Sequence, residues 1–189
     1  EFMVWRKQTS LRETIALPGG PIEVRVTLLD DFASLGWAAW GTCDHSHTGG
    51  WTTDDGIMVV APSWKLGSED YRVSLLAHEA QHFIDYRLYP KLSSPDLEYR
   101  AKLVELALAD ETQAHLLDKF STEADRDRTL PHQFASYWVI ERLRSRLGGE
   151  QWRSFPRSVV RHAALAELAA HDGALDAIGS ASVQTALPD

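Results

Sequence analysis

The stretch His78-Glu79-Ala80-Gln81-His82 lies near the centre of a longer segment, Ser68 to Leu88, that contains no glycine or proline. Apolar residues recur along this segment at the spacing of an α-helix. Ser68 can cap the N-terminus of such a helix, and Pro90 follows its end. We therefore expect one helix from Ser68 to Leu88, with the five quoted residues inside it and packed against a core.

The part of the chain before this segment is typical of strands. Residues 22–28 alternate apolar and polar side chains, and residues 56–61 form a short apolar run closed by Pro62. Residues 36–42 are consistent with a second strand or a short helix. Residues 43–55 are polar and contain glycine, so we expect a loop there.

The part of the chain after this segment is typical of helices. We expect a helix at 94–108, one from Pro131 to Leu147 that stops at Gly148-Gly149, and one that follows Pro156 and ends near Asp172-Gly173. Residues 173–189 are small and weakly patterned, which fits a short helix or a loose tail. Strands followed by helices predict one α+β domain, residues 3–189, with a small, mostly antiparallel N-terminal sheet and a helical half.

The quoted stretch has the spacing of a zinc site. Residues four apart lie on one face of a helix, so His78 and His82 can bind the same cation, and Glu79 lies close enough to act on a water molecule there. A catalytic zinc needs a third protein ligand. The residue six positions after His82 is Leu88, which cannot serve, and Asp85 fits better as a helix-surface group or a group behind the ligands.

The other arrangement takes the third ligand from the next helix, which offers two candidates. Glu98 and Glu105 are seven residues apart, so they share a face but differ in height by roughly 10 Å, and only one can reach the metal. The distances of His82, Glu98 and Glu105 along their helices from the connecting turn do not decide between the two glutamates. The small residue Ala101, one turn after Glu98, favours Glu98, and the remaining glutamate can then brace a ligand histidine or pair with Arg100.

The motif followed by a helix bearing Glu98 and Ala101 resembles the gluzincin metallopeptidases, particularly the small minigluzincins. The block from Gly49 to Ala109 also resembles a subgroup of uncharacterised bacterial proteins. This resemblance implies a zincin-like fold, zinc bound by His78, His82 and Glu98, and Glu79 as general base. It further implies a strand above the cleft that pairs with an extended substrate, which position alone matches to residues 56–61.

The expected activity is hydrolysis of a peptide bond by a water molecule that the metal activates and Glu79 deprotonates. Such sites often add a side chain that stabilises the oxyanion. The candidates are His115, His132 and Tyr137, of which His132 is favoured because it opens a later helix. His45 and His47 are candidates for the border of the cleft. The alternatives are a zinc-binding interaction or sensor module, a protease homologue inhibited by its own tail in the cleft, and a helical protein without metal.

Composition limits the partners and the compartment. A net charge of −8 argues against a nucleic-acid surface, and no apolar run approaches the length of a membrane span. We expect a peptide or protein substrate, no nucleic acid and no membrane, and nothing indicates the oligomeric state. The single cysteine, Cys43, excludes an internal disulfide. Glu1-Phe2 before Met3 resembles a cloning remnant. A chain that begins at Met3 would be cytoplasmic, whereas a preceding targeting segment would change that expectation.

Overall fold

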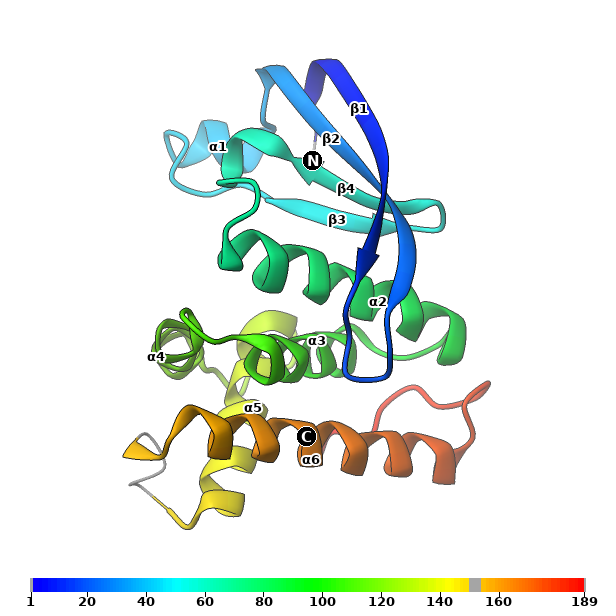
Figure 1. Ribbon diagram of the computed structural model, residues 1–189, viewed down its shortest axis with the longest axis vertical. Coiled ribbons are helices and arrows are strands. Elements are labelled where there is room, and N and C mark those ends of the chain that lie inside the picture. Colours follow the sequence, from blue (N-terminus) through cyan, green and yellow to red (C-terminus); the bar gives the residue numbers. More distant parts are fainter. Residues whose placement is uncertain (1, 150–153, 189) are drawn as a thin grey trace.

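The computed structural model describes residues 2–149 and 154–188, and it has the α+β architecture that the sequence predicts (Figure 1). The sheet lies at one end of the molecule, and the helices are stacked beneath it. The expectations about Glu1 and about the last residue of the C-terminal segment, Asp189, fall outside the described residues. No helix in the described part of the chain is long and apolar enough to cross a membrane.

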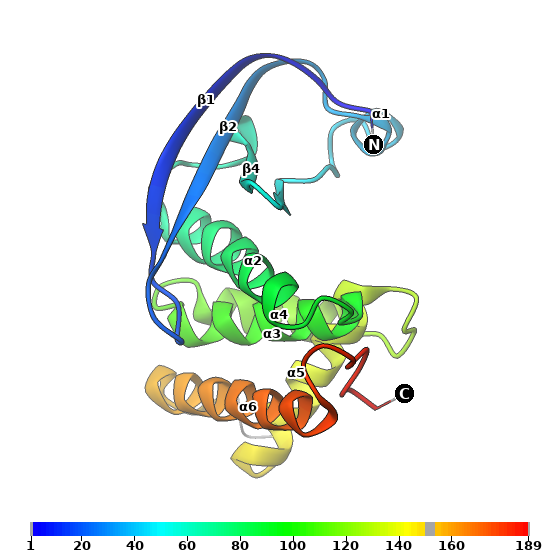
Figure 2. The same cartoon turned by 90° about the vertical axis from the view of Figure 1, so that its right-hand side faces the viewer.

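Four strands form a mixed sheet in the order β1-β2-β4-β3. Two of the three pairings are antiparallel, β1 with β2 and β3 with β4, while β2 and β4 run parallel. The bounds are β1 Val4–Ile15, β2 Ile22–Ser34, β3 Gly50–Thr53 and β4 Gly56–Val60. β1 and β2 form a long hairpin that arches over the rest of the sheet (Figure 2).

The predicted strands at 22–28 and 56–61 correspond to β2 and β4, whereas β1 and β3 were not expected. The predicted loop at 43–55 is therefore partly wrong, because Gly50–Thr53 within it forms β3. The segment at 36–42 contains a short helix, α1 (Trp37–Gly41). Two apolar side chains of β2, Val24 and Val26, are buried in the core, as their alternation with polar residues predicts.

The central helical segment has two parts. Residues Tyr71–Ala77 form a π-helix, which continues directly into α2 (His78–Leu88). Ser68 caps the start as predicted, because the Tyr71 backbone N–H donates to Ser68 Oγ at 3.2 Å. The wider π-helical turns precede the histidines immediately, so the chain changes its helical geometry at the motif itself.

The helical half is organised around α3 (Ser94–Leu108), which packs against α2, α5 and α6 and is buried along most of its length. The prediction at 94–108 is therefore confirmed. α5 (Pro131–Leu147) also has its predicted bounds and stops at Gly148, whose positive φ of 88° suits glycine. α6 (Arg157–Ile178) runs past its expected end, and α4 (Gln113–Glu123) was not expected.

The segment after α6 is packed, so the expectation of a loose tail at 173–189 is wrong for the described residues. Asp96, fully buried in the first turn of α3, accepts hydrogen bonds from the backbone N–H groups of Ala186 (2.8 Å) and Leu187 (3.0 Å) and from the hydroxyl of Thr185 (2.8 Å). Val183 is also fully buried. One carboxylate in α3 thus holds the C-terminal segment against the helical half.

Candidate metal site and cleft

A polar cleft of about 500 Å³ lies between β3 on one side and α2 and α3 on the other. Residues from the π-helix and α2 form its floor, and α5 contributes one residue, His132. The sequence candidates that line the cleft are His47, His78, Glu79, His82, Glu98, Glu105 and His132. No residue of the described C-terminal segment lines the cleft, so the idea that the tail fills it has no support.

Three of these side chains converge on one point. His78 Nε2 and His82 Nε2 lie 3.1 Å apart, and the Glu98 carboxylate faces both nitrogens, with Oε2 at 3.3 Å from His78 Nε2 and Oε1 at 3.4 Å from His82 Nε2. Ligands of a tetrahedral zinc at about 2.0–2.1 Å are separated from one another by about 3.3 Å. The three side chains therefore fit the spacing of such a site, and they are the group in the described residues that could hold a metal ion.

The electrostatics of the site also call for a cation. Burial alone would lower the pKa of His78, but hydrogen bonds to Glu105 and Glu98 raise it to about 10. Burial would raise the pKa of Glu98, yet His132, His78 and His82 hold it far below its usual range. Glu98 Oε2 is buried, and its close neighbours include two histidine nitrogens, His132 Nδ1 at 2.9 Å and His78 Nε2 at 3.3 Å. A proton or a metal ion would satisfy this excess of negative charge.

Of the two glutamates on α3, Glu105 is the one that supports a histidine from behind, as expected for the glutamate that does not reach the metal position. Its Oε1 lies 2.8 Å from His78 Nδ1, which fixes the ring and directs Nε2 towards Glu98. A carboxylate behind a ligand histidine orients the ring and makes it a better ligand. Arg100 pairs instead with Asp85, at 2.8 Å. Asp85 is fully buried, so its prediction as a helix-surface group is wrong; it joins α2 to α3 through Arg100.

Glu79 faces the cleft from the same turn as the ligands, and β3 holds it in place. The hydroxyl of Thr52 lies 2.8 Å from Glu79 Oε2 and 2.7 Å from the backbone oxygen of Glu79. Sequence reasoning missed Thr52, because the segment that contains it was expected to be a loop. A hydrogen bond to one carboxylate oxygen leaves the other free to accept a proton from water.

His132 is the only oxyanion candidate of the three that lines the cleft, and His115 and Tyr137 do not. Its Nδ1 lies 2.9 Å from Glu98 Oε2, while 62% of its side chain remains exposed. His132 can therefore steady Glu98 with one nitrogen and present the other towards the cleft. Of the two loop histidines, His47 borders the cleft and His45 does not.

The strand that borders the candidate metal site is β3. The resemblance had suggested residues 56–61, which contain β4. β4 lies between β2 and β3, so both of its edges are paired, and the assignment of residues 56–61 to substrate pairing is wrong. β3 is the edge strand, and Gly50 to Thr52 line the cleft. Gly50 lets β3 lie close to the backbone of β4, because a Cβ at this position would meet Met58 O at 2.6 Å.

Comparisons with protein-family models, with curated proteins and with solved structures gave no match for this chain. The site is therefore interpreted from its own geometry.

Proposed function

We propose that this protein is a zinc-dependent metallopeptidase of the gluzincin type, with His78, His82 and Glu98 as the zinc ligands. The observation that carries the proposal is the convergence of His78, His82 and Glu98, whose ligand atoms all lie within 4.8 Å of one another, with Glu79 beside them in the cleft. A zinc ion held there would lower the pKa of a water molecule and polarise the scissile carbonyl.

The residues around the ligands supply the other steps. Glu79 accepts a proton from the attacking water and returns it to the leaving amine, while Thr52 keeps its carboxylate turned towards the cleft. Glu105 holds the His78 ring in the orientation that binding needs. In its imidazolium form, His132 would donate one hydrogen bond from Nδ1 to Glu98 and a second, from Nε2, to the oxygen that becomes negative during attack.

The position of β3 supports an extended peptide as the substrate. An edge strand offers backbone N–H and C=O groups that pair with an added strand, and this edge borders the proposed zinc site. Backbone pairing of this kind selects for extended chains and depends little on the side chains of the substrate. A peptide or an exposed protein segment therefore fits the cleft better than a compact small molecule.

Glu79→Gln tests the proposal, because the amide keeps the shape of the side chain but cannot take the proton. We expect this variant to retain one zinc per chain by elemental analysis and to lose hydrolysis of a fluorogenic peptide mixture by at least a hundredfold. Glu111→Gln is the control, because it removes one negative charge at an exposed position outside the cleft, and this variant should behave as the parent. A parent protein that binds zinc but cleaves nothing would identify a binding module. A parent without zinc would refute the site.

A further inference from the structure

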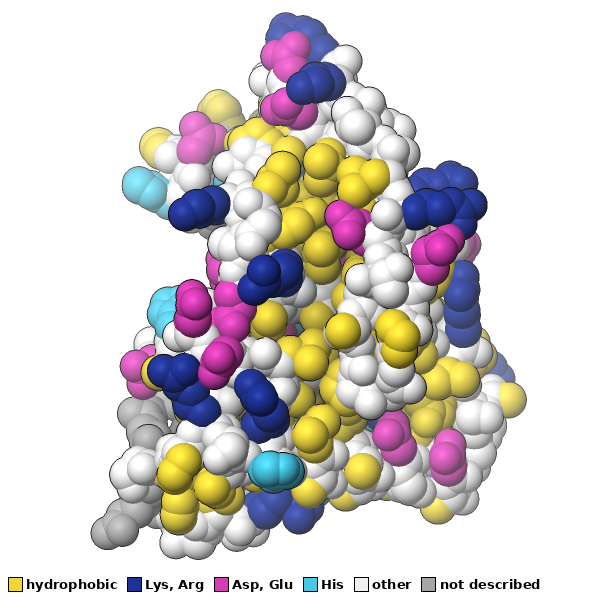
Figure 3. All heavy atoms as spheres, viewed as in Figure 1, with side chains coloured by type: hydrophobic (Ala, Val, Ile, Leu, Met, Phe, Trp, Pro, Cys, Tyr) yellow, Lys and Arg dark blue, Asp and Glu magenta, His cyan; other side chains and the backbone are white. Residues whose placement is uncertain are grey.

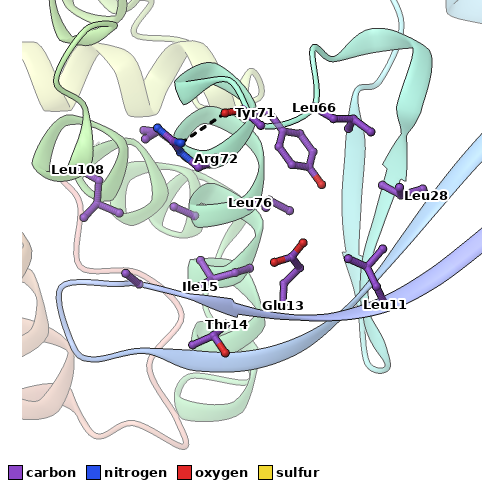
Figure 4. Close-up of a pocket in the computed structure, with 14 residues that line it drawn as sticks. Leu11, Glu13, Thr14, Ile15, Leu28, Leu66, Tyr71, Arg72, Leu76 and Leu108 are labelled. Atoms are coloured by element: carbon purple, nitrogen blue, oxygen red, sulfur yellow. Dashed lines mark hydrogen bonds between the residues drawn. The ribbon is translucent and has the colours of Figure 1, made fainter.

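A second cavity, of about 560 Å³, lies between the β1–β2 hairpin and the π-helix (Figure 4). Hydrophobic side chains gather on this face of the molecule, between the hairpin and the helices (Figure 3). The lining is mostly apolar, and it shares no residue with the metal cleft. The apolar lining residues are Leu11, Ile15, Ala16, Leu28, Leu66, Val73, Leu76, Ala77 and Leu108.

One carboxylate interrupts this apolar wall. Glu13 occupies an inward-facing position of β1 between Leu11 and Ile15, where the alternation of the strand calls for an apolar residue. Figure 4 shows its carboxylate pointing into the cavity, towards the hydroxyl of Tyr71. The Glu13 carboxylate forms no side-chain hydrogen bond or ion pair with any described residue, although the backbone of Glu13 pairs with Val24 in the sheet. A charge in an apolar wall is costly unless something pairs with it.

The positive side chain in the lining of the cavity does not pair with Glu13. Arg72 also lines the cavity, but its guanidinium donates to the backbone oxygen of Gly67 at 3.4 Å, as the dashed line in Figure 4 marks. The phenol of Tyr71 also lines the cavity, and its pKa is raised by burial and by the charge of Glu13. The carboxylate of Glu13 and the hydroxyl of Tyr71 therefore face the cavity together, and the Arg72 guanidinium in the same lining is bonded to Gly67 rather than to Glu13.

We propose that this cavity is a binding site for a small apolar molecule that carries a cationic nitrogen, such as an alkyl or aryl amine. The ammonium group of the ligand pairs with the Glu13 carboxylate and lies beside the Tyr71 hydroxyl. The hydrocarbon part of the ligand packs against the leucines of the lining. An anionic ligand of the same size meets repulsion from Glu13. A neutral ligand gains the apolar contacts but leaves the carboxylate unpaired.

The cavity and the metal cleft lie on opposite sides of the same π-helix. Val73, Leu76 and Ala77 face the cavity, whereas Ser74 and Leu75, on the other side of the same π-helix, line the metal cleft. A molecule in the cavity therefore packs against the segment that leads directly into His78. The existence of the site does not depend on the proposed peptidase activity.

Isothermal titration of the full chain at pH 7.5 with octylamine, octanol and octanoate tests the proposal. We expect octylamine to bind at least tenfold more tightly than octanol, and octanoate to bind most weakly. Glu13→Gln, which keeps the shape of the side chain, should abolish the preference for the amine and leave octanol binding unchanged. Leu11→Trp should weaken all binding by filling the cavity.

Glu23→Gln is the matched control, since it removes the same charge from the adjacent strand at an exposed position paired with Arg12. It should keep the preference of the parent. The proposal is overturned if octylamine does not bind, if it binds no better than octanol, or if Glu13→Gln and Glu23→Gln behave alike.

Discussion

Asp96→Asn is expected to loosen the C-terminal segment and to destabilise the whole fold. The Asp96 carboxylate is fully buried and accepts hydrogen bonds from Ser93, Thr185, Ala186 and Leu187. All of these partners are donors. An asparagine presents its own N–H₂ donor to some of them, so at least one buried donor loses its acceptor.

The size of the effect follows from the pKa of Asp96. Burial alone would raise it, but hydrogen bonds from His171, Ser93, Ala186 and Thr185 lower it from 3.8 to about 2. A shift of this size corresponds to about 2 kcal/mol of stability at neutral pH. For a chain of this length, the expected fall in Tm is about 4–8 °C.

The assay is thermal and urea unfolding of the parent, Asp96→Asn and Asp110→Asn, each in chelator. The Asp110 side chain is exposed and pairs with Arg157 at the surface, so its variant should unfold close to the parent. The contribution of Asp96 is present above pH 3.8 and is lost as the pH falls through about 2, so the parent should show this acid-dependent loss and Asp96→Asn should not. Equal stability of the parent and Asp96→Asn at pH 7 would refute the reasoning.

Two further predictions concern the site. Thr52→Val should retain zinc but reduce kcat at least tenfold, because Glu79 loses a hydrogen bond to its carboxylate, and Thr52→Ser should recover most of the rate; a valine variant as fast as the parent contradicts this role. Zinc binding to metal-free protein at pH 8 should release about one proton, since a pKa of about 10 keeps His78 protonated there. The stability that this proton gives the metal-free protein is present below pH 6.5 and lost as the pH rises through about 10. Calorimetry in two buffers of different ionisation enthalpy measures the release, and an identical heat in both is the contrary result.

The two histidines of the group that could hold a metal ion could be predicted because their relation depends on local spacing. His78 and His82 are one turn apart in the helix, and that relation survives any packing of the domain. The choice between Glu98 and Glu105 depended on how two helices pack, which their sequences express only weakly through Ala101. The structure places Glu98 at the two Nε2 atoms and Glu105 at the back of His78.

The parts that sequence reasoning missed depend on contacts between distant segments. β3 has only four residues, and it forms because β4 pairs with it and because Gly50 lets it approach closely. Thr52 consequently could not be recognised as a partner of Glu79. The C-terminal segment has little pattern of its own, and it is ordered by Asp96, which from sequence alone is only an acidic residue at the start of a helix.

Diffraction from crystals soaked in zinc chloride, recorded on both sides of the zinc absorption edge, tests the central claim most directly. The account predicts one strong anomalous peak, about 2.0–2.2 Å from His78 Nε2, His82 Nε2 and a carboxylate oxygen of Glu98, with Glu105 still bonded to His78 Nδ1. A crystal without a peak between these side chains, or with a zinc ion that Glu105 coordinates in place of Glu98, would contradict it.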